Sequence, residues 1–383
     1  MPIEDRFRFW CTQGAIKPGG PSDWAICDVD QRRVITVRMD EEQDSEDVAL
    51  GYFKRHVESL GPDITLIHLA PNGDVVSVST DLMDDTTLTM CYPSLNLVQA
   101  PEGVQTILRS DLRELDRFIT NVDLVSYQST DTTPPTTKKA VFKYYWQEQF
   151  MEQRWDELNL WVRLPSHPNI VPIDRIVLDE VRGGVVGFTT PYIPGGNLED
   201  NTSRPFKLKW AKQLMQVVDD LNLRYGISHQ DVVPRNLLID EDADNIMLYD
   251  FNVAAQIGRD RGLGFLHYWD VRDDVRAVIF TIYELITRDF HFRQQDWREL
   301  DLSTVQDVEW VLHPDVTLDH PVSEYRALLN AWVKGREQGV QVTMYTEAPH
   351  YIDWPLLEKL EPERTLQGDY HLLASGKLLD PVE

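Results

Sequence analysis

Apolar residues in the first hundred positions follow two different periods. Residues 33–39 read RVITVRM, where two sets of side chains alternate at period two, and this alternation predicts a strand. Shorter strand-like runs occupy residues 7–11, 24–30, 64–70 and 74–80. Within residues 45–61 apolar side chains recur at helical spacing, at Val48, Tyr52, Phe53, Val57 and Leu60. We therefore predict a small α+β module over residues 1–100.

A second change of pattern comes at residues 129–139, where paired prolines and threonines exclude a helix and suit an exposed turn. A strand follows at residues 140–146, and helical patterns then dominate, at residues 150–164, 207–224, 271–287 and 322–337. The third of these helices is apolar almost all round, which predicts a central, buried position. We expect a β-rich unit over residues 105–190 and a helical unit over residues 191–383.

The balance of charges narrows the possible partners. The chain of 383 residues has 37 Lys and Arg against 63 Asp and Glu, a formal net charge of −26. Nucleic acids and anionic membranes bind through clustered cations, so neither is an expected partner.

The apolar runs are shorter than a membrane span, and the N-terminal MPIEDRFRFWC lacks the apolar segment of a secretory signal. With 3 cysteines there is no disulfide framework, and we expect a cytoplasmic globular protein.

Six short motifs then occur in a fixed order along the chain. They are Lys143 in AVFKYY, Glu157 in DELNLW, HPNIV at 167–171, YIPGGNL at 192–198, HQDVVPRN at 229–236 and YDFN at 249–252. This ordered set resembles the protein kinase fold over roughly residues 105–335. The strings VDLVSY and VFKYY also resemble those of uncharacterised kinase-like proteins of fungi. The resemblance implies a bilobal α+β fold that binds ATP and Mg²⁺, with residues 1–100 as an accessory module.

The resemblance also implies a role for each matching residue. Lys143 takes the place of the strand lysine that grips the α- and β-phosphates, and Glu157 that of the helix glutamate that holds it. Asp231 takes the place of the residue that accepts or orients the substrate hydroxyl. Asn236 and Asp250 take the places of the magnesium ligands.

The local pattern agrees with the first two of these assignments. Val141 and Lys143 share one face of a strand, so the lysine lies beside an apolar residue that can cover an adenine. Glu157 falls on a helical stripe with Phe150, Trp161 and Leu164. An inward carboxylate needs a cation, and Lys143 is the expected partner.

An adenine site follows from the next motif. Pro191 offers a carbonyl to the adenine amino group, Ile193 keeps an N–H for the ring nitrogen, and Leu238 is expected to form the floor.

The chain departs from the family in several places. Gln230 replaces the usual Arg, which argues against control by activation-loop phosphorylation. Val233 replaces the usual Lys, and Arg235 takes the place of that Lys as a phosphate-side cation. Asn252 stands where the family has Gly, a mild change because Asn tolerates positive φ. Residues 117–127 contain no glycine in place of the glycine-rich loop, and residues 251–273 contain no APE motif before Asp274, the expected brace of the catalytic loop.

We therefore expect an ATP- and magnesium-dependent kinase, a phosphotransferase with an alcohol acceptor. The shortened activation segment favours a small hydroxyl-bearing molecule, and Phe265, Tyr268 and Trp269 are candidates to wall its pocket or simply to pack on the helical lobe. Two alternatives stay open: an atypical protein Ser/Thr kinase with a docking surface in residues 1–100, and a nucleotide-binding pseudokinase scaffold, which the missing glycine loop favours. Residues 1–100 serve either a structural role or the binding of a protein partner.

Overall fold

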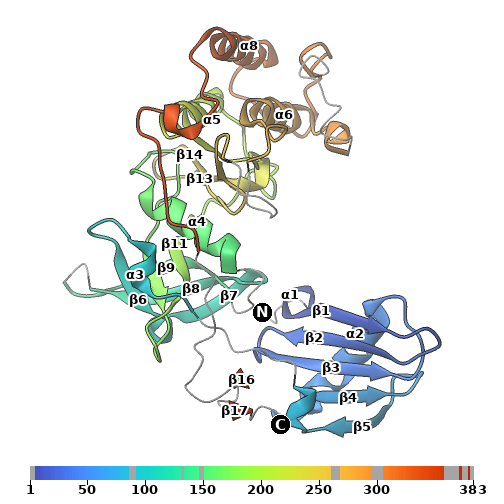
Figure 1. The fold of residues 1–383 in the computed structure, drawn as a ribbon. Coiled ribbons are helices and arrows are strands. Elements are labelled where there is room, and N and C mark those ends of the chain that lie inside the picture. Colours follow the sequence, from blue (N-terminus) through green and yellow to red (C-terminus); the bar gives the residue numbers. More distant parts are fainter. Residues whose placement is uncertain are drawn as a thin grey trace.

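A computed structural model describes residues 5–85, 92–130, 133–145, 151–259, 268–294 and 305–357, together with the short strands β16 (His371–Leu372) and β17 (Leu378–Leu379). It is a mixed α+β structure with two large sheets and several helices. Figure 1 shows the helices α5, α6 and α8 at one end of the molecule and the two sheets at the other. No helix among the described residues is both long and apolar enough to cross a membrane.

The N-terminal sheet has five strands in the order β1 (Phe9–Ile16), β2 (Ser22–Asp28), β3 (Arg33–Met39), β4 (Leu66–Leu69) and β5 (Val75–Ser79). All neighbours are antiparallel except β3 and β4, which helix α2 (Glu46–His56) connects. The Ser45 side chain caps the helix by accepting from the N–H of Asp47. Phe53 is buried against the sheet and meets Phe9 edge to face. The predicted strands and helix of this region are confirmed.

The second sheet has six strands in the order β6 (Gln105–Leu108), β10 (Arg175–Leu178), β11 (Val185–Pro191), β9 (Thr136–Tyr144), β8 (Val122–Ser129) and β7 (Arg113–Ile119). Only β6 and β10 are parallel. Helix α4 (Met151–Arg163) packs on this sheet through Trp161, which contacts Phe188 of β11. A turn of two residues, Thr120 and Asn121, joins β7 to β8, and Asn121 has a φ of 66°.

The C-terminal part is mainly helical, and its three long helices together with α4 confirm the four predicted helices. Its long helices are α5 (Leu208–Asp219), α6 (Asp274–Thr287) and α8 (Val322–Gln338), and α5 continues as a π-helical turn over Asp220–Arg224. Two small ribbons pair β12 (Ile227–Ser228) with β15 (Ala255–Gln256) and β13 (Leu237–Asp240) with β14 (Asn245–Leu248). The remaining short elements are the α-helices α1 (Asp5–Arg8) and α3 (Leu95–Val98) and 3₁₀ turns at Val57–Ser59, Leu82–Asp84, Arg109–Asp111, Pro234–Asn236, His291–Gln294 and Tyr345–Glu347.

One apolar core joins α4 and β11 to the C-terminal helices. Trp161, Phe188, Leu214, Ile282 and Leu329 all belong to it, and each is buried. Burial of this continuous core is the dominant stabilising contribution to such an assembly. It fixes the sheet and the helices on either side of the segment that carries the candidate site.

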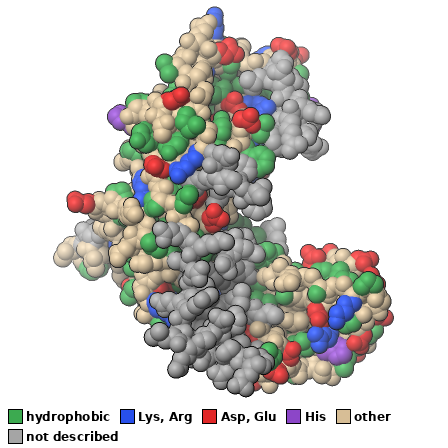
Figure 2. Space-filling model, in the orientation of Figure 1, with side chains coloured by type: hydrophobic (Ala, Val, Ile, Leu, Met, Phe, Trp, Pro, Cys, Tyr) green, Lys and Arg blue, Asp and Glu red, His purple; other side chains and the backbone are tan. Residues whose placement is uncertain are grey.

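A smaller core joins the N-terminal sheet to the second sheet. Cys27, Val29 and Val34 pack with Phe142 and Tyr144 on the far side of the contact. Figure 2 shows acidic side chains scattered over both the helical part and the N-terminal sheet, in keeping with the net charge of −26.

Candidate active site

A buried ion-pair network connects strand β9, helix α4 and the end of the β14 hairpin. The Nζ of Lys143 lies 2.6 Å from Oε1 of Glu157 and 2.5 Å from Oδ1 of Asp250. The Glu157 side chain is fully buried, and its second oxygen accepts from Nη1 of Arg154 at 2.6 Å. The structure therefore brings Lys143 and Glu157 together as expected, and it adds Asp250 to the same network. Because the side chains of Lys143 and Glu157 are almost fully buried, each of these two charges depends on its partner for stability.

The surroundings of Asp250 favour the ionised form of its carboxyl. Burial would raise the pKa of its carboxyl, but the Lys143 ammonium and, more weakly, Arg154 outweigh burial and lower the pKa below its ordinary value. The backbone of Asp250 has a φ of 66°, a strained value for a residue with a side chain. The loop thus keeps an ionised carboxylate at a fixed place, as a cation ligand requires.

The loop at residues 229–236 presents the other candidate residues. Both carboxylate oxygens of Asp231 accept from Nη2 of Arg235, at 3.1 and 2.9 Å. The side-chain amide of Asn236 donates to the backbone oxygen and to Oδ2 of Asp231, each at 2.9 Å. The N–H of Tyr249, which precedes Asp250, donates to the backbone oxygen of Asn236 at 3.2 Å. Asp231, Asn236 and Asp250 are therefore carried by backbone segments that are hydrogen-bonded to one another.

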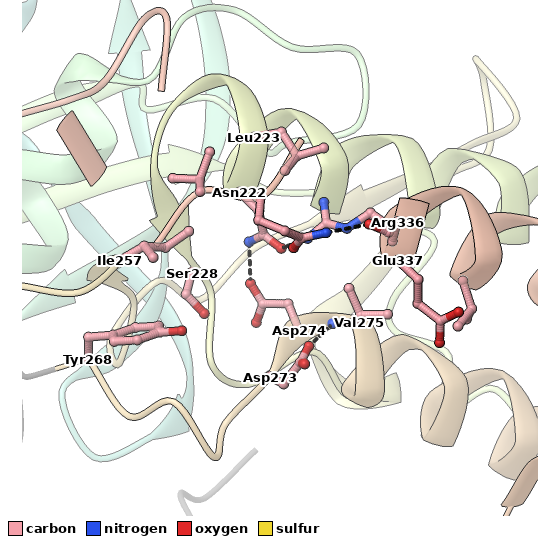
Figure 3. Close-up of a pocket in the computed structure, with 13 residues that line it drawn as sticks. Asn222, Leu223, Ser228, Ile257, Tyr268, Asp273, Asp274, Val275, Arg336 and Glu337 are labelled. Carbon is pink, nitrogen blue, oxygen red and sulfur yellow. Dashed lines mark hydrogen bonds between the residues drawn. The ribbon is translucent and has the colours of Figure 1, made fainter. Parts of the chain in front are cut away.

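Helix α6 braces this loop through Asp274. Its carboxylate accepts from the N–H groups of His229 and Gln230, and from Nδ2 of Asn222, each at 2.8 Å. Figure 3 shows the bond from Asn222 and the neighbouring Asp273 at the start of the helix. Gln230 has a φ of 62°, so the loop needs external support for this conformation. Asp274 supplies that support, as the sequence predicted.

A cleft of about 710 Å³ lies between the second sheet and the helical part. The predicted adenine-site residues Val141, Pro191, Ile193 and Leu238 all line it. So do Lys143, Asp250 and side chains of the β7–β8 hairpin. The volume is in the range that holds a ligand of nucleotide size. Arg235 is more exposed than these residues. It pairs with Asp231 and is not among the described residues that line the cleft.

Several polar residues of this cleft were not singled out as site residues by the sequence, and Arg154 and Asn252 are two of them. Arg154 lies three residues before Glu157 on helix α4 and lines the cleft. Asn252 also lines it, and its Oδ1 is buried with no partner among the described residues. The i, i+3 spacing of Arg154 and Glu157 on one predicted helix is the signal that points to the arginine.

The aromatic wall suggested for the acceptor is only partly described. Tyr268 lines a different cavity of about 280 Å³, with Ser228, Asp274 and Arg336 (Figure 3). It does not line the cleft beside Lys143, and its place in an acceptor pocket beside Asp231 stays a prediction. The N–H of Trp269 donates to Oε1 of Gln230, whereas Phe265 and Phe150 lie outside the described residues.

The donor set suits a hard divalent cation supplied with a substrate. The Asp250 carboxylate and the Asn236 amide oxygen are oxygen ligands, and Mg²⁺ is usually bound by one or two carboxylates plus phosphate oxygens. The unpartnered Oδ1 of Asn252 is a third oxygen beside Asp250. Within the described part of the chain, no group of three or more His, Cys, Asp or Glu residues forms a metal site. These oxygen atoms fit magnesium that arrives with phosphates.

Comparison with known proteins identifies kinases among its relatives. No family model matches the chain. CBL-interacting protein kinase 15 of Oryza sativa subsp. japonica is 32% identical over 112 residues, which are 28% of this chain and 25% of that protein. CBL-interacting serine/threonine-protein kinase 5 of Arabidopsis thaliana is 33% identical over 126 residues, 30% of this chain and 26% of that protein. The chain spans about a quarter of the length of the curated relatives it matches. These similarities support a relationship to the protein kinases.

Proposed function

We propose that this protein is an ATP- and magnesium-dependent phosphotransferase with a bilobal, protein-kinase-like fold. Residues 105–190 are the β-rich lobe and residues 191–383 the helical lobe, beside an accessory module at residues 1–100. The observation that carries the proposal is the Lys143 ammonium, held between Glu157 and Asp250 at the wall of a 710 Å³ cleft. Transfer of a phosphoryl group needs such fixed charges, because catalysis rests on positioning and on stabilising spread negative charge.

Each residue then has a defined task. Lys143 holds phosphate oxygens of ATP, and Asp250 and Asn236 hold magnesium, which neutralises phosphate charge when it is bound. Asp231 accepts the proton of the acceptor hydroxyl while the new bond forms between that oxygen and the γ-phosphorus. The bond from the γ-phosphorus to the bridging oxygen breaks, and ADP leaves with the electron pair. Arg235 keeps the Asp231 carboxylate in place before the acceptor binds.

We propose a small hydroxyl-bearing molecule as the acceptor. An extended peptide is recognised through backbone partners on a docking ledge, and residues 251–273 leave little room for one. A protein Ser/Thr kinase is the second candidate, because several matched relatives are named serine/threonine-protein kinases. The absence of glycine in residues 117–127 favours a third, a nucleotide-binding scaffold without turnover.

Nucleotide binding is the first test. Thermal unfolding of the wild-type chain is measured with ATP, with and without magnesium, since a ligand of the native state raises stability by RT ln(1 + [L]/Kd). We expect a magnesium-dependent shift that Asp250→Asn removes and Asp231→Asn retains. Asp242→Asn, in the exposed β13–β14 turn, is the matched control. A wild-type chain that shows no shift with any nucleotide contradicts the proposal.

Labelled ATP then separates the acceptor classes. We expect labelling of a compound in a metabolite extract, lost in Asp231→Asn, and little labelling of a peptide array. Labelled peptides without a labelled small molecule would favour the protein kinase. Binding without any labelling would favour the scaffold. Full turnover in both Asp231→Asn and Asp250→Asn would place catalysis elsewhere.

A further inference from the structure

Arg154 occupies a position in the cleft that the roles above leave unused. Among the described residues its guanidinium has one hydrogen bond, from Nη1 to Oε2 of Glu157 at 2.6 Å. Its side chain is 12% exposed, and its Nε is buried with no hydrogen-bond partner among the described residues. Arg154 nevertheless lines the same cleft as Lys143 and Asp250. A buried donor without a partner in a ligand cleft indicates a hydrogen bond that a ligand completes.

We propose that Arg154 is a second phosphate-binding cation, which binds the polyphosphate of a nucleoside triphosphate in place of a glycine-rich loop. The proposal rests on the proposed function and assigns to it one further binding residue. A guanidinium is always charged and presents five donors in a planar fork that matches phosphate oxygens. The contact with Glu157 anchors one end of that fork and leaves the rest for a ligand.

The β7–β8 turn gives an independent reason for such a cation. Glycine-rich loops bind phosphates through successive backbone N–H groups. Here the turn has two residues, Thr120 and Asn121, and the flanking Ile119 and Val122 are paired in the ladder. Few backbone donors are therefore available, and side chains must supply the contacts.

The charges of the site lead to the same residue. Lys143 and Arg154 contribute two positive charges, which Glu157 and Asp250 balance with two negative ones. Without Arg154 this group would be negative before a nucleotide entered. ATP with one magnesium ion is itself an anion, so a negative wall would oppose it. Arg235 does not fill this need, because it is occupied by both oxygens of Asp231.

A series of ligands with an increasing number of phosphates tests the assignment without any measurement of turnover. Affinities for adenosine, AMP, ADP and ATP, each with magnesium, are measured by calorimetry on the wild type and on Arg154→Gln, Arg154→Lys and Arg113→Gln. Arg113 is an exposed arginine of β7 outside the cleft, so its variant is the matched control. We expect Arg154→Gln to weaken ATP binding by about tenfold or more and adenosine binding by less than about twofold. Arg154→Lys should recover most of the loss.

A merely structural role gives a different result. If Arg154 acts only by positioning Glu157, and through it Lys143, Arg154→Gln causes no further loss of ATP affinity in a Glu157→Gln background, and the inference is overturned. Equal losses for adenosine and ATP, or no loss for either, also overturn it. Modification of wild-type arginines by phenylglyoxal covers the case in which Arg154→Gln does not fold. ATP should protect Arg154 and adenosine should not, whereas equal protection would contradict the assignment. If the wild-type chain binds no nucleotide, the proposed function itself is wrong. If the wild type and Arg154→Gln bind ATP equally tightly, only this inference is wrong.

Discussion

The contact between Asp274 and the loop at residues 229–236 allows a sharp test of how the candidate site is held. Asp274 is 2% exposed, and its carboxylate accepts three hydrogen bonds of 2.8 Å: two from the N–H groups of His229 and Gln230, and one from Asn222. In Asp274→Asn, one oxygen keeps its two donors, but the new amide group faces the N–H of Gln230. The substitution removes the charge and leaves a buried donor unpaired.

The magnitude follows from these contacts. A hydrogen bond to a charged group contributes about 1.5–3 kcal/mol, and an unpaired buried donor costs about 1–3 kcal/mol. We therefore expect Asp274→Asn to lower the free energy of unfolding by about 2–4 kcal/mol. Replacement by Ala should cost more, because all three donors then lose their acceptor.

Asp273 provides a control one residue away. Its side chain is exposed and caps α6 by accepting from the N–H groups of Val275 at 2.6 Å and Arg276 at 3.3 Å. Asn caps helices about as well as Asp, so Asp273→Asn should change the free energy of unfolding by less than about 0.5 kcal/mol. The same chemical change thus has two very different expected costs at adjacent positions.

Urea unfolding followed by tryptophan fluorescence measures both variants against the wild type. The midpoints give the differences if the slopes stay equal. A loss below about 1 kcal/mol for Asp274→Asn, or an equal loss for Asp273→Asn, would refute the view that the Asp274 carboxylate is the main polar support of the loop.

Three further changes test other contacts. Burial, opposed by Arg117, raises the pKa of Asp123 to about 6. The folded protein therefore binds more protons than the unfolded chain, and its stability falls as pH rises. Between pH 4 and pH 7, urea titrations should show a fall in the free energy of unfolding that is about 2 kcal/mol larger for the wild type than for Asp123→Asn. Glu157→Gln breaks a buried pair with Lys143 and should cost about 3 kcal/mol in the same assay; a cost below about 0.5 kcal/mol would contradict the network. Asp30→Asn removes a partly exposed partner of Arg117 and should lower stability by about 1 kcal/mol, with no loss if the two sheets are not docked through this pair.

Local pattern was enough to predict most of the secondary structure. The strands and the helix of the first hundred residues lie where period-two and helical spacing placed them. Apart from β5, which is mostly exposed, they bury side chains on their neighbours. The orientation of α2 is less well predicted: Val48 is 38% exposed, and Ala49 is fully buried. A small residue allows a helix to approach a sheet closely, and a count of apolar positions does not register that preference.

The candidate site was predictable because charged residues in apolar surroundings need partners. Lys143 and Glu157 each lie on a predicted buried face, so their pairing follows from burial. The contact between Asp30 and Arg117 could not be predicted in this way, since the two residues are 87 positions apart and belong to different sheets. Docking of one sheet on another leaves no periodic signal in either segment.

Under the proposed function, the β7–β8 hairpin explains how the cleft can be covered without glycine. A glycine-rich loop follows the phosphates because its backbone is free to adopt many conformations. Here Asn121 accepts the left-handed conformation of a tight turn, and Arg117 is buried between Asp123 and Asp30, which ties the hairpin to the N-terminal sheet. A cover held in this way needs little ordering when a ligand binds, but it cannot bend around the phosphates. Under the proposed function, the phosphate contacts therefore come from side chains, from Lys143 of β9 and from Arg154 of helix α4.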